Sequence, residues 1–392
     1  MLVLNTGICF VIFLIGYNLK NAFSDFTVTD RRLINKLFFY HFLIAISFHF
    51  YISIYGGDAT FYWNTPKLIS FNEIIELVKK GSASGVIYLL NYFPSKVLNL
   101  SFFTGNMLYA LFGYLGFIYI YRITKTLFKD FSVISKIKIF GIPVFPWIWF
   151  LPNLHFWSSG IGKDAILFLV IAVFAYSLQK LKKRWIGLAL SLLIALLIRP
   201  HIALFLLTAF GIGFILDGTL KGYQKLFIFL LFIAGFVSIF DYVLEFVQLE
   251  SLEATAIEDY TSTKISKLNK ITSGSGVDVS EYPFPAKFAT FLYRPFFFDI
   301  NGILAVIASI ENLILLIFTF HVISNKPVKG FWEGNFLIKG IFIYFLIGTI
   351  AFSLILGNLG IMLRQKNMLI PVFFIFGFWV FYQNKIEKYN TK

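Results

Sequence analysis

The chain has 392 residues, of which 58% are hydrophobic and 14% charged, and its formal net charge is +14. Soluble domains carry about 25% charged and about 45–50% apolar residues, so this composition excludes an ordinary soluble protein. The mean hydropathy of +0.79 also excludes a disordered chain. The sequence predicts an all-α, polytopic membrane protein that forms a single integral membrane domain over residues 1–392.

Apolar segments long enough to cross a hydrocarbon core about 30 Å thick recur along the chain. The first has neither a basic leader nor a small-residue cleavage site, so we interpret it as a retained span. The segment 139–151 contains Pro143 and Pro146, which favour a kinked or re-entrant path. The pattern predicts about eleven spans of roughly 17–25 residues, near residues 2–17, 36–55, 105–124, 139–151, 164–179, 185–198, 202–216, 226–243, 301–324, 336–356 and 367–382.

Basic residues divide unevenly between the two sides of these spans. With the N-terminus outside, the cytoplasmic segments hold 21 of the 34 basic residues and six of the 20 acidic ones. Cytoplasmic loops of membrane proteins collect Lys and Arg, so the asymmetry predicts an N-outside, C-inside orientation. The positive charge is then a topology signal, and nucleic acid is not expected as a partner.

Two outer segments are long enough to hold structure of their own. Residues 56–104 contain two stretches, FNEIIELVKKG and VIYLLNYFPSKVLNL, that read as amphipathic helices lying at the membrane interface. Residues 244–299 form a long outer loop with a Gly/Ser stretch at 273–276, and loops of this length are typical of lids and binding loops.

Asp58 follows a Gly-Gly pair at the outer end of a span, where a carboxylate suits a general base. Tyr62 and Trp63 lie beside it and are typical of a sugar-stacking surface. The alternatives are a solvated loop aspartate and an aromatic belt at the interface.

The stretch NLHFWSSGIGKDAILFL places His155, Lys163 and Asp164 at the start of a helix. Backbone N–H groups at such a position bind anions, and Lys163 adds a positive charge. The alternative is that Lys163 extends toward the interface while Asp164 caps the helix. His155 is also a candidate acid–base residue.

Further polar residues lie in segments that the predicted topology places on the outer side of the membrane. Arg199 suits phosphate recognition, and His201 is either a base or a turn histidine. Arg294 and Arg364 either bind substrate or pair with the acidic segment 250–259. Glu311-Asn312 is either a network between helices or part of a cavity lining. The predicted substrate-binding residues are Tyr62, Trp63, Lys163, Asp164, Arg199, Tyr293, Arg294, Arg364, Gln365 and Lys366, and the predicted catalytic residues are Asp58, His155 and His201.

Several motifs are absent from the sequence, including HExxH, GxSxG and the Walker A motif. ATP does not occur at an outer membrane face, so a transfer reaction there needs a substrate that carries its own activation. A lipid-linked sugar phosphate meets this need: the aspartate would deprotonate an acceptor hydroxyl, and the basic residues would neutralise the leaving phosphate.

The order of span, Gly-Asp-aromatic loop, two interfacial helices and span resembles the start of the GT-C class glycosyltransferases. The motifs HFWSSGIGKDAI, IRPH and GNLGIMLRQK are similar to those of oligosaccharide-unit polymerases from bacterial surface-polysaccharide clusters. The resemblance implies an enzyme of the bacterial inner membrane that uses a polyprenyl-(pyro)phosphate-linked sugar donor and a glycan or lipid-linked acceptor at the extracytoplasmic face. Asp58 matches the acidic residue of the family's first outer loop. The family has an acidic pair there and this chain has one aspartate, so no metal ligands are assigned and the need for a divalent cation stays open.

Two other functions fit parts of this pattern. A transporter or flippase of lipid-linked oligosaccharide would use the same arginines for binding, but it predicts two pseudo-symmetric halves and charges on both faces. A structural membrane subunit is the third possible function. The number of polar residues predicted on the outer side disfavours it.

Overall fold

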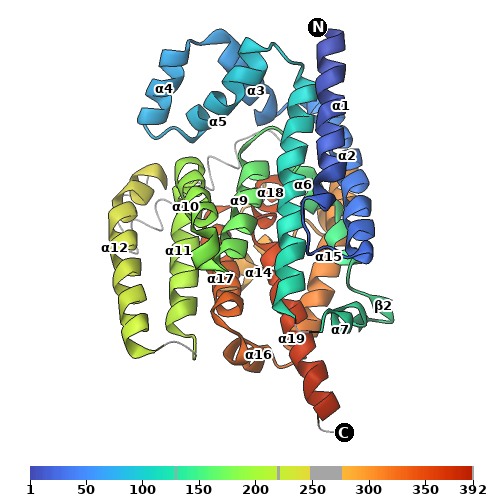
Figure 1. Ribbon diagram of the computed structural model, residues 1–392, viewed down its shortest axis with the longest axis vertical. Helices are drawn as coiled ribbons and strands as arrows, with labels where there is room; N and C mark the ends of the chain where they lie inside the picture. Colours follow the sequence, from blue (N-terminus) through green and yellow to red (C-terminus); the bar gives the residue numbers. More distant parts are fainter. Residues whose placement is uncertain (129, 219–220, 248–275, 391–392) are drawn as a thin grey trace. The chain divides into compact units, whose positions relative to one another are not determined.

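The computed structural model describes residues 1–128, 130–218, 221–247 and 276–390, and these are almost entirely helical (Figure 1). The all-α prediction is therefore confirmed. The chain divides into two compact units: unit 1 comprises Met1–Ile123 and Trp149–Arg199, and unit 2 comprises Thr124–Ile148 and Pro200–Lys392. Half of the expected outer loop 244–299, namely residues 248–275, lies outside the described residues.

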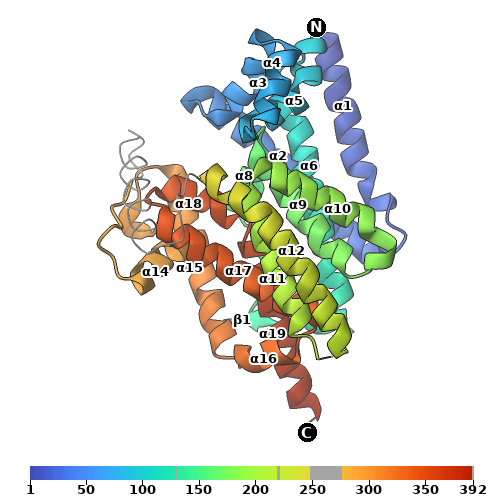
Figure 2. The ribbon, with the colours of Figure 1, turned by 90° about the vertical axis from the view of Figure 1, so that its left-hand side faces the viewer.

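Unit 1 is built on long helices with a group of short helices at one end. Helices α3, α4 and α5 lie together where α2 ends and α6 begins (Figures 1 and 2). The elements of unit 1 are α1 (Leu2–Asn18), η1 (Leu19–Asn21), α2 (Val28–Tyr55), α3 (Asp58–Leu68), α4 (Phe71–Lys79), α5 (Ala83–Asn91), the π-helix η2 (Tyr92–Val97), α6 (Phe102–Leu127, its last turn in unit 2), η3 (Trp147–Phe150, its first turn in unit 2), α8 (Pro152–Trp157), α9 (Lys163–Leu178) and α10 (Leu181–Ile198).

The helices of the 56–104 segment follow from local sequence. Ser70 and Glu73 form a capping box at the start of α4, in which each side chain accepts the other residue's backbone N–H. Ile74 is buried while Glu73 and Glu76 are exposed, so α4 is amphipathic as expected. The position of α3, α4 and α5 at a membrane interface stays a prediction.

Unit 2 contains the remaining elements. They are α7 (Phe131–Ser135), β1 (Lys138–Ile139), β2 (Ile142–Pro143), α11 (Pro200–Ile215), α12 (Gly222–Val247), α14 (Phe284–Tyr293), η4 (Phe297–Asp299), α15 (Ile303–Ile323), α16 (Pro327–Glu333), α17 (Phe336–Ile355), α18 (Leu359–Lys366) and α19 (Ile370–Asn390). Its core includes the packing of α11 on α17, where a Cβ on Gly213 would lie 2.6 Å from the Phe336 carbonyl oxygen. Small residues allow two helices to approach this closely.

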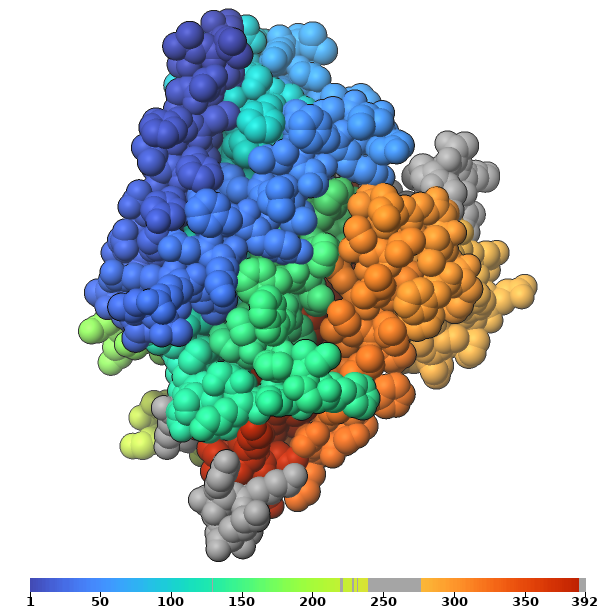
Figure 3. Space-filling model, turned by 90° about the vertical axis from the view of Figure 1, so that its right-hand side faces the viewer, coloured from blue at the N-terminus to red at the C-terminus, as the bar shows by residue number. Residues whose placement is uncertain are grey.

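Five helices of the described residues are long and apolar enough to cross a membrane: Leu2–Asn21, Val28–Tyr55, Phe102–Leu127, Ile303–Ile323 and Phe336–Ile355. A sixth span results if α18 and α19, which are bent by 54°, are taken together. Helix α1 lies on the surface of unit 1 with only Ile12 and Gly16 buried, as suits a helix that faces lipid (Figure 3). These helices support a membrane protein, but the expected count of eleven spans is not confirmed.

The prediction of a span at 139–151 is wrong. The chain there forms the two-stranded hairpin β1–β2 and the 3-10 turn η3. Gly141 makes the turn of the hairpin with φ +79°, a conformation that glycine adopts without strain. Pro143 and Pro146 lack the N–H that a helix needs, so a continuous helix is disfavoured.

Candidate functional site

Residues 149–162 of unit 1 contain the short helix α8 between stretches that are not α-helical. This segment is largely buried against α2 and α6. Two glycines permit this packing. A Cβ on Gly113 of α6 would lie 1.9 Å from the Ser158 carbonyl oxygen, and one on Gly160 would lie 2.0 Å from the ring of Phe48. Irregular backbone inside an apolar bundle requires internal hydrogen-bond partners, because lipid supplies none.

Polar side chains on α2 and α6 supply some of these partners. Asn106 Oδ1 accepts the N–H of Ile161 at 3.1 Å, and Asn106 Nδ2 lies 3.1 Å from His49 Nδ1. The hydroxyl of Ser158 donates to the Leu154 carbonyl, and that of Ser159 donates to the Phe156 carbonyl. Both serine hydroxyls therefore bond within this segment, and the anion-binding arrangement expected at the start of α9 stays a prediction.

His155 lies at the centre of this packing and is fully buried. Its Nδ1 is 2.9 Å from Nδ1 of His41, its Nε2 is 2.8 Å from the Trp149 carbonyl oxygen, and Phe117 stacks on its ring at 4.1 Å. Both ring nitrogens have protein partners, and burial lowers the pKa of His155 well below its ordinary value, with His41 acting in the same direction. We therefore assign His155 a structural role instead of the catalytic role expected from the sequence.

The aromatic pair of α3 divides into two roles. Trp63 is completely buried, with its ring against Gly105 and its Nε1 donating to the Leu100 carbonyl at 3.3 Å. Tyr62 faces the start of α9: the Lys163 ammonium lies 5.7 Å from its ring centroid, within the range of cation–π attraction. Both rings are buried, Trp63 completely and Tyr62 at 7% exposed, and Tyr62 is the one that contacts the start of α9.

Asp58 is the first residue of α3 and is exposed. It precedes Tyr62 by four residues, so the two side chains project from one face of the helix, one turn apart. Because Tyr62 packs on Lys163, this face of α3 is directed toward the start of α9.

Asp164 and Arg199 form a buried ion pair in unit 1. Arg199 Nη2 donates to Asp164 Oδ1 at 2.9 Å, and the two side chains are only 10% and 7% exposed. Asp164 lies in the first turn of α9 and Arg199 caps the end of α10, so the pair joins the two helix ends. Together with Tyr62, Lys163 and Asp58, it makes up the unit 1 site.

The predicted residues beyond residue 199 lie in unit 2. Lys366 is 2% exposed, and its ammonium donates to the carbonyls of Leu292 and Arg294 and to Asn312 Oδ1, at 2.8–3.1 Å. Asn312 in turn donates to the Pro295 carbonyl at 2.7 Å. Asn312 is thus part of a network between helices, and Lys366 holds the ends of α14 and α18 together.

Arg294 forms a bidentate pair with Asp299, with distances of 2.9 Å from Nε and 2.5 Å from Nη2. The hydrogen bonds that Arg294 donates to Asp299 raise the pKa of Arg294. Burial acts to raise the pKa of Asp299, but its bonds from Arg294 and the Phe296 N–H lower it overall. Among the described residues, the carboxylate that pairs with Arg294 is therefore Asp299, five residues further along the chain. The acidic segment 250–259 lies outside the described residues.

Four other predicted residues take defined places in unit 2. Arg364 is half-buried and Gln365 is buried, both on α18. His201 lies in the first turn of α11 and contacts the rings of Phe205 and Phe352. Tyr293 is the last residue of α14 and is half-buried. Substrate contact by these four residues stays a prediction.

Sequence reasoning missed the polar residues inside the long helices, above all His41 and Asn106. Both are completely buried in spans that were predicted from apolar content alone. A polar side chain in a span indicates a partner within the bundle, and that signal is present in the sequence.

Among the described residues, no group of three or more His, Cys, Asp or Glu side chains is placed to hold a metal ion. Comparison of the chain with protein-family models, curated proteins and solved structures found no match.

Proposed function

We propose that the chain is a membrane glycosyltransferase or polysaccharide polymerase that transfers sugar from a polyprenyl-(pyro)phosphate-linked donor. The proposal retains the extracytoplasmic site and the bacterial inner membrane expected from the sequence. The observation that carries it is the grouping at the start of α9: the Lys163 ammonium lies over the Tyr62 ring, and Asp58 lies one turn away on the same face of α3.

Each residue of the unit 1 site has a distinct role in this proposal. Asp58 is the general base that removes the proton of the acceptor hydroxyl. Lys163 and the first N–H groups of α9 neutralise the phosphate that leaves as the glycosidic bond forms. Tyr62, which is buried, holds Lys163 in place. The buried Asp164–Arg199 pair fixes the helix ends that carry them.

The remaining basic residues divide by what they contact. Lys366 donates to three oxygen atoms of the protein, so we assign it to positioning α14 and α18 and not to phosphate binding. Arg364 and His201 lie in unit 2, and their roles stay sequence predictions.

Replacing Asp58 with Asn tests the proposal in cells that depend on this chain for a surface glycan. The variant keeps the size of the side chain and loses the base, so the glycan should fall to undetectable levels while the amount of protein in the membrane stays unchanged. Glu76→Gln is the matched control, because it removes one exposed carboxylate from α4 of the same segment. A normal glycan profile in the Asp58 variant contradicts the proposal.

A further inference from the structure

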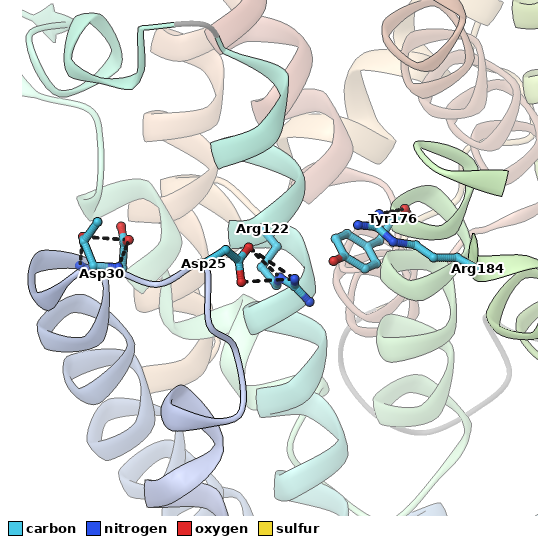
Figure 4. A network of polar contacts seen from close by, with 6 residues as sticks. Asp25, Asp30, Arg122, Tyr176 and Arg184 are labelled. Carbon is cyan, nitrogen blue, oxygen red and sulfur yellow. Dashed lines mark hydrogen bonds and ion pairs between the residues drawn. The ribbon is translucent and has the colours of Figure 1, made fainter. Parts of the chain in front are cut away.

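A second polar cluster in unit 1 surrounds Tyr176, thirteen residues after the start of α9 and so about 20 Å along that helix. The guanidinium carbons of Arg122 and Arg184 lie 4.5 Å and 3.6 Å from the centroid of the Tyr176 ring. Figure 4 shows both arginines directed toward Tyr176. Cation–π attraction holds the two guanidinium groups near the ring but leaves both positive charges in place.

The two arginines differ in their partners. Arg122 pairs with Asp25, with a shortest distance of 3.2 Å (Figure 4). Arg184 donates from Nη1 to the Tyr176 carbonyl at 2.7 Å, and within the described part of the chain it has no carboxylate partner. A guanidinium carries five N–H bonds, so most of the Arg184 donors are left for a ligand or for water.

The local backbone exposes this charge. Helix α10 is interrupted at Arg184, where φ is −128° and ψ is 18°, and the exposed Lys180, Lys182 and Lys183 precede it. Partial burial lowers the pKa of Arg184 and the charge of Arg122 acts in the same direction, whereas Tyr176 and the nearby Asp25 carboxylate act to raise it. An anion bound here would offset the effects of burial and of Arg122.

An apolar stripe continues from this point along the outer face of α10. Trp185 is 62% exposed and directly follows Arg184. The stripe consists of Ile186, Leu190, Leu193 and Leu197, all exposed and spaced by three or four residues. Its length is about 17 Å at 1.5 Å per residue, which matches half of a hydrocarbon core about 30 Å thick.

We propose that Arg184, with Arg122 beside it, binds the phosphate group of an anionic phospholipid whose acyl chains lie along this stripe. The planar guanidinium suits two phosphate oxygens at once. Trp185 stands where the headgroup meets the acyl chains, the depth at which tryptophan concentrates in membrane proteins. The stripe identifies the ligand as a lipid and not as free phosphate, since it supplies one leaflet's depth of apolar surface.

The test uses the purified full-length chain in a neutral detergent, with dioleoylphosphatidylglycerol, dioleoylphosphatidylcholine and inorganic phosphate as separate probes. Binding is measured by native mass spectrometry and by the shift in melting temperature. Phosphatidylglycerol should bind the wild type, and Arg184→Gln should weaken that binding about tenfold. Lys182→Gln removes the same charge from an exposed position two residues away and should leave the affinity within about twofold.

Three outcomes overturn the proposal. The first is equal binding of phosphatidylglycerol and phosphatidylcholine by the wild type, and the second is unchanged affinity in Arg184→Gln. The third is protection by millimolar inorganic phosphate equal to that by the lipid, which would make free phosphate the ligand. If Arg184→Gln fails to fold, Arg184→Lys keeps the charge without the planar fork and should bind about threefold more weakly; wild-type affinity in that variant contradicts the site.

Discussion

At the scale of single residues, burial separates a lysine that holds the fold from the lysine of the proposed site. Lys366 and Lys163 are both lysines at helix ends, yet Lys366 is 2% exposed and donates to three oxygen atoms of the protein. Lys163 is partly exposed and packs on Tyr62. Their chemical types are the same in the sequence, and only their surroundings distinguish a positioning residue from a binding one.

Replacing Lys366 with Met should lower the free energy of unfolding by about 3 kcal/mol, because Asn312 and two backbone carbonyls lose a charged donor. Lys329→Met is the control: this lysine pairs with Glu333 and Glu387 at the surface, and its loss should cost about 0–1 kcal/mol. Denaturant titration in detergent micelles measures both. Equal losses would show that burial does not set the role of Lys366.

The Asp164–Arg199 pair should behave as a single unit. Asp164→Asn and Arg199→Gln each leave one buried group without its partner, so each should lower the free energy of unfolding by about 3–5 kcal/mol. The double variant leaves no uncompensated charge and should lose clearly less than the sum of the two. A double-mutant cycle of denaturant titrations measures the coupling. Additive losses would mean that the two side chains do not depend on each other.

At the scale of elements, close packing fixes the irregular segment that leads into α9. Gly113 of α6 lies so near Ser158 that an added Cβ would stand 1.9 Å from its carbonyl oxygen. The backbone of α6 at Gly113 is helical and cannot move far, so the position of α6 determines where α9 starts. The hydrogen bond of Asn106 to the Ile161 N–H adds a second point of attachment.

Gly113→Ala should therefore destabilise the protein by about 1–3 kcal/mol and also reduce glycan assembly, since it displaces the segment that carries Lys163. Gly7→Ala is the control: Gly7 is helical, a Cβ there meets nothing within 4 Å, and the change should be neutral or slightly stabilising. Melting temperature and glycan level measure the two effects. A Gly113→Ala protein as stable as the wild type would contradict the packing of this segment.

Much of the element level was readable from the sequence. The apolar runs predict α1, α2, α6, α9, α15 and α17, and the amphipathic spacing of FNEIIELVKKG predicts α4. The segment 139–151 was predicted as a kinked or re-entrant span, but Gly141, Pro143 and Pro146 favour a hairpin and a turn there. The site was partly readable. Lys163 and Tyr62 were both proposed, but their contact joins residues a hundred positions apart, and no local pattern encodes such a pairing.

At the scale of the whole molecule, the orientation of the chain in the membrane is the prediction on which the proposed function depends. The structure has five or six candidate spans in its described residues, whereas the apolar segments predict about eleven. Lys and Arg concentrate in the segments that the eleven-span pattern assigns to the cytoplasm, and that pattern counts 139–151 as a span. An extracytoplasmic substrate requires that Asp58 lie on the outer side.

Reporter fusions test this orientation directly. A fluorescent protein that folds only in the cytoplasm should be active when fused after residue 183 or at the C-terminus, and inactive after residue 80. Alkaline phosphatase, which requires an oxidising compartment, should show the reverse pattern. Fluorescence after residue 80 would place Asp58 in the cytoplasm and remove the argument that ATP is absent from the site.

The central claim is that the chain forms a glycosidic bond with Asp58 as the base. The most direct measurement is sugar transfer by the purified protein in detergent micelles, supplied with polyprenyl-phosphate-linked saccharides extracted from the cells that make the glycan. A detergent micelle does not separate two aqueous compartments, so transport cannot be observed there, whereas sugar transfer by an enzyme can. The proposal predicts a new glycosidic product with the wild type and with Glu76→Gln, and a loss of at least about 100-fold with Asp58→Asn. Absence of product from the folded wild type would contradict the proposal. Equal amounts of product from the wild type and the Asp58 variant would contradict it as well.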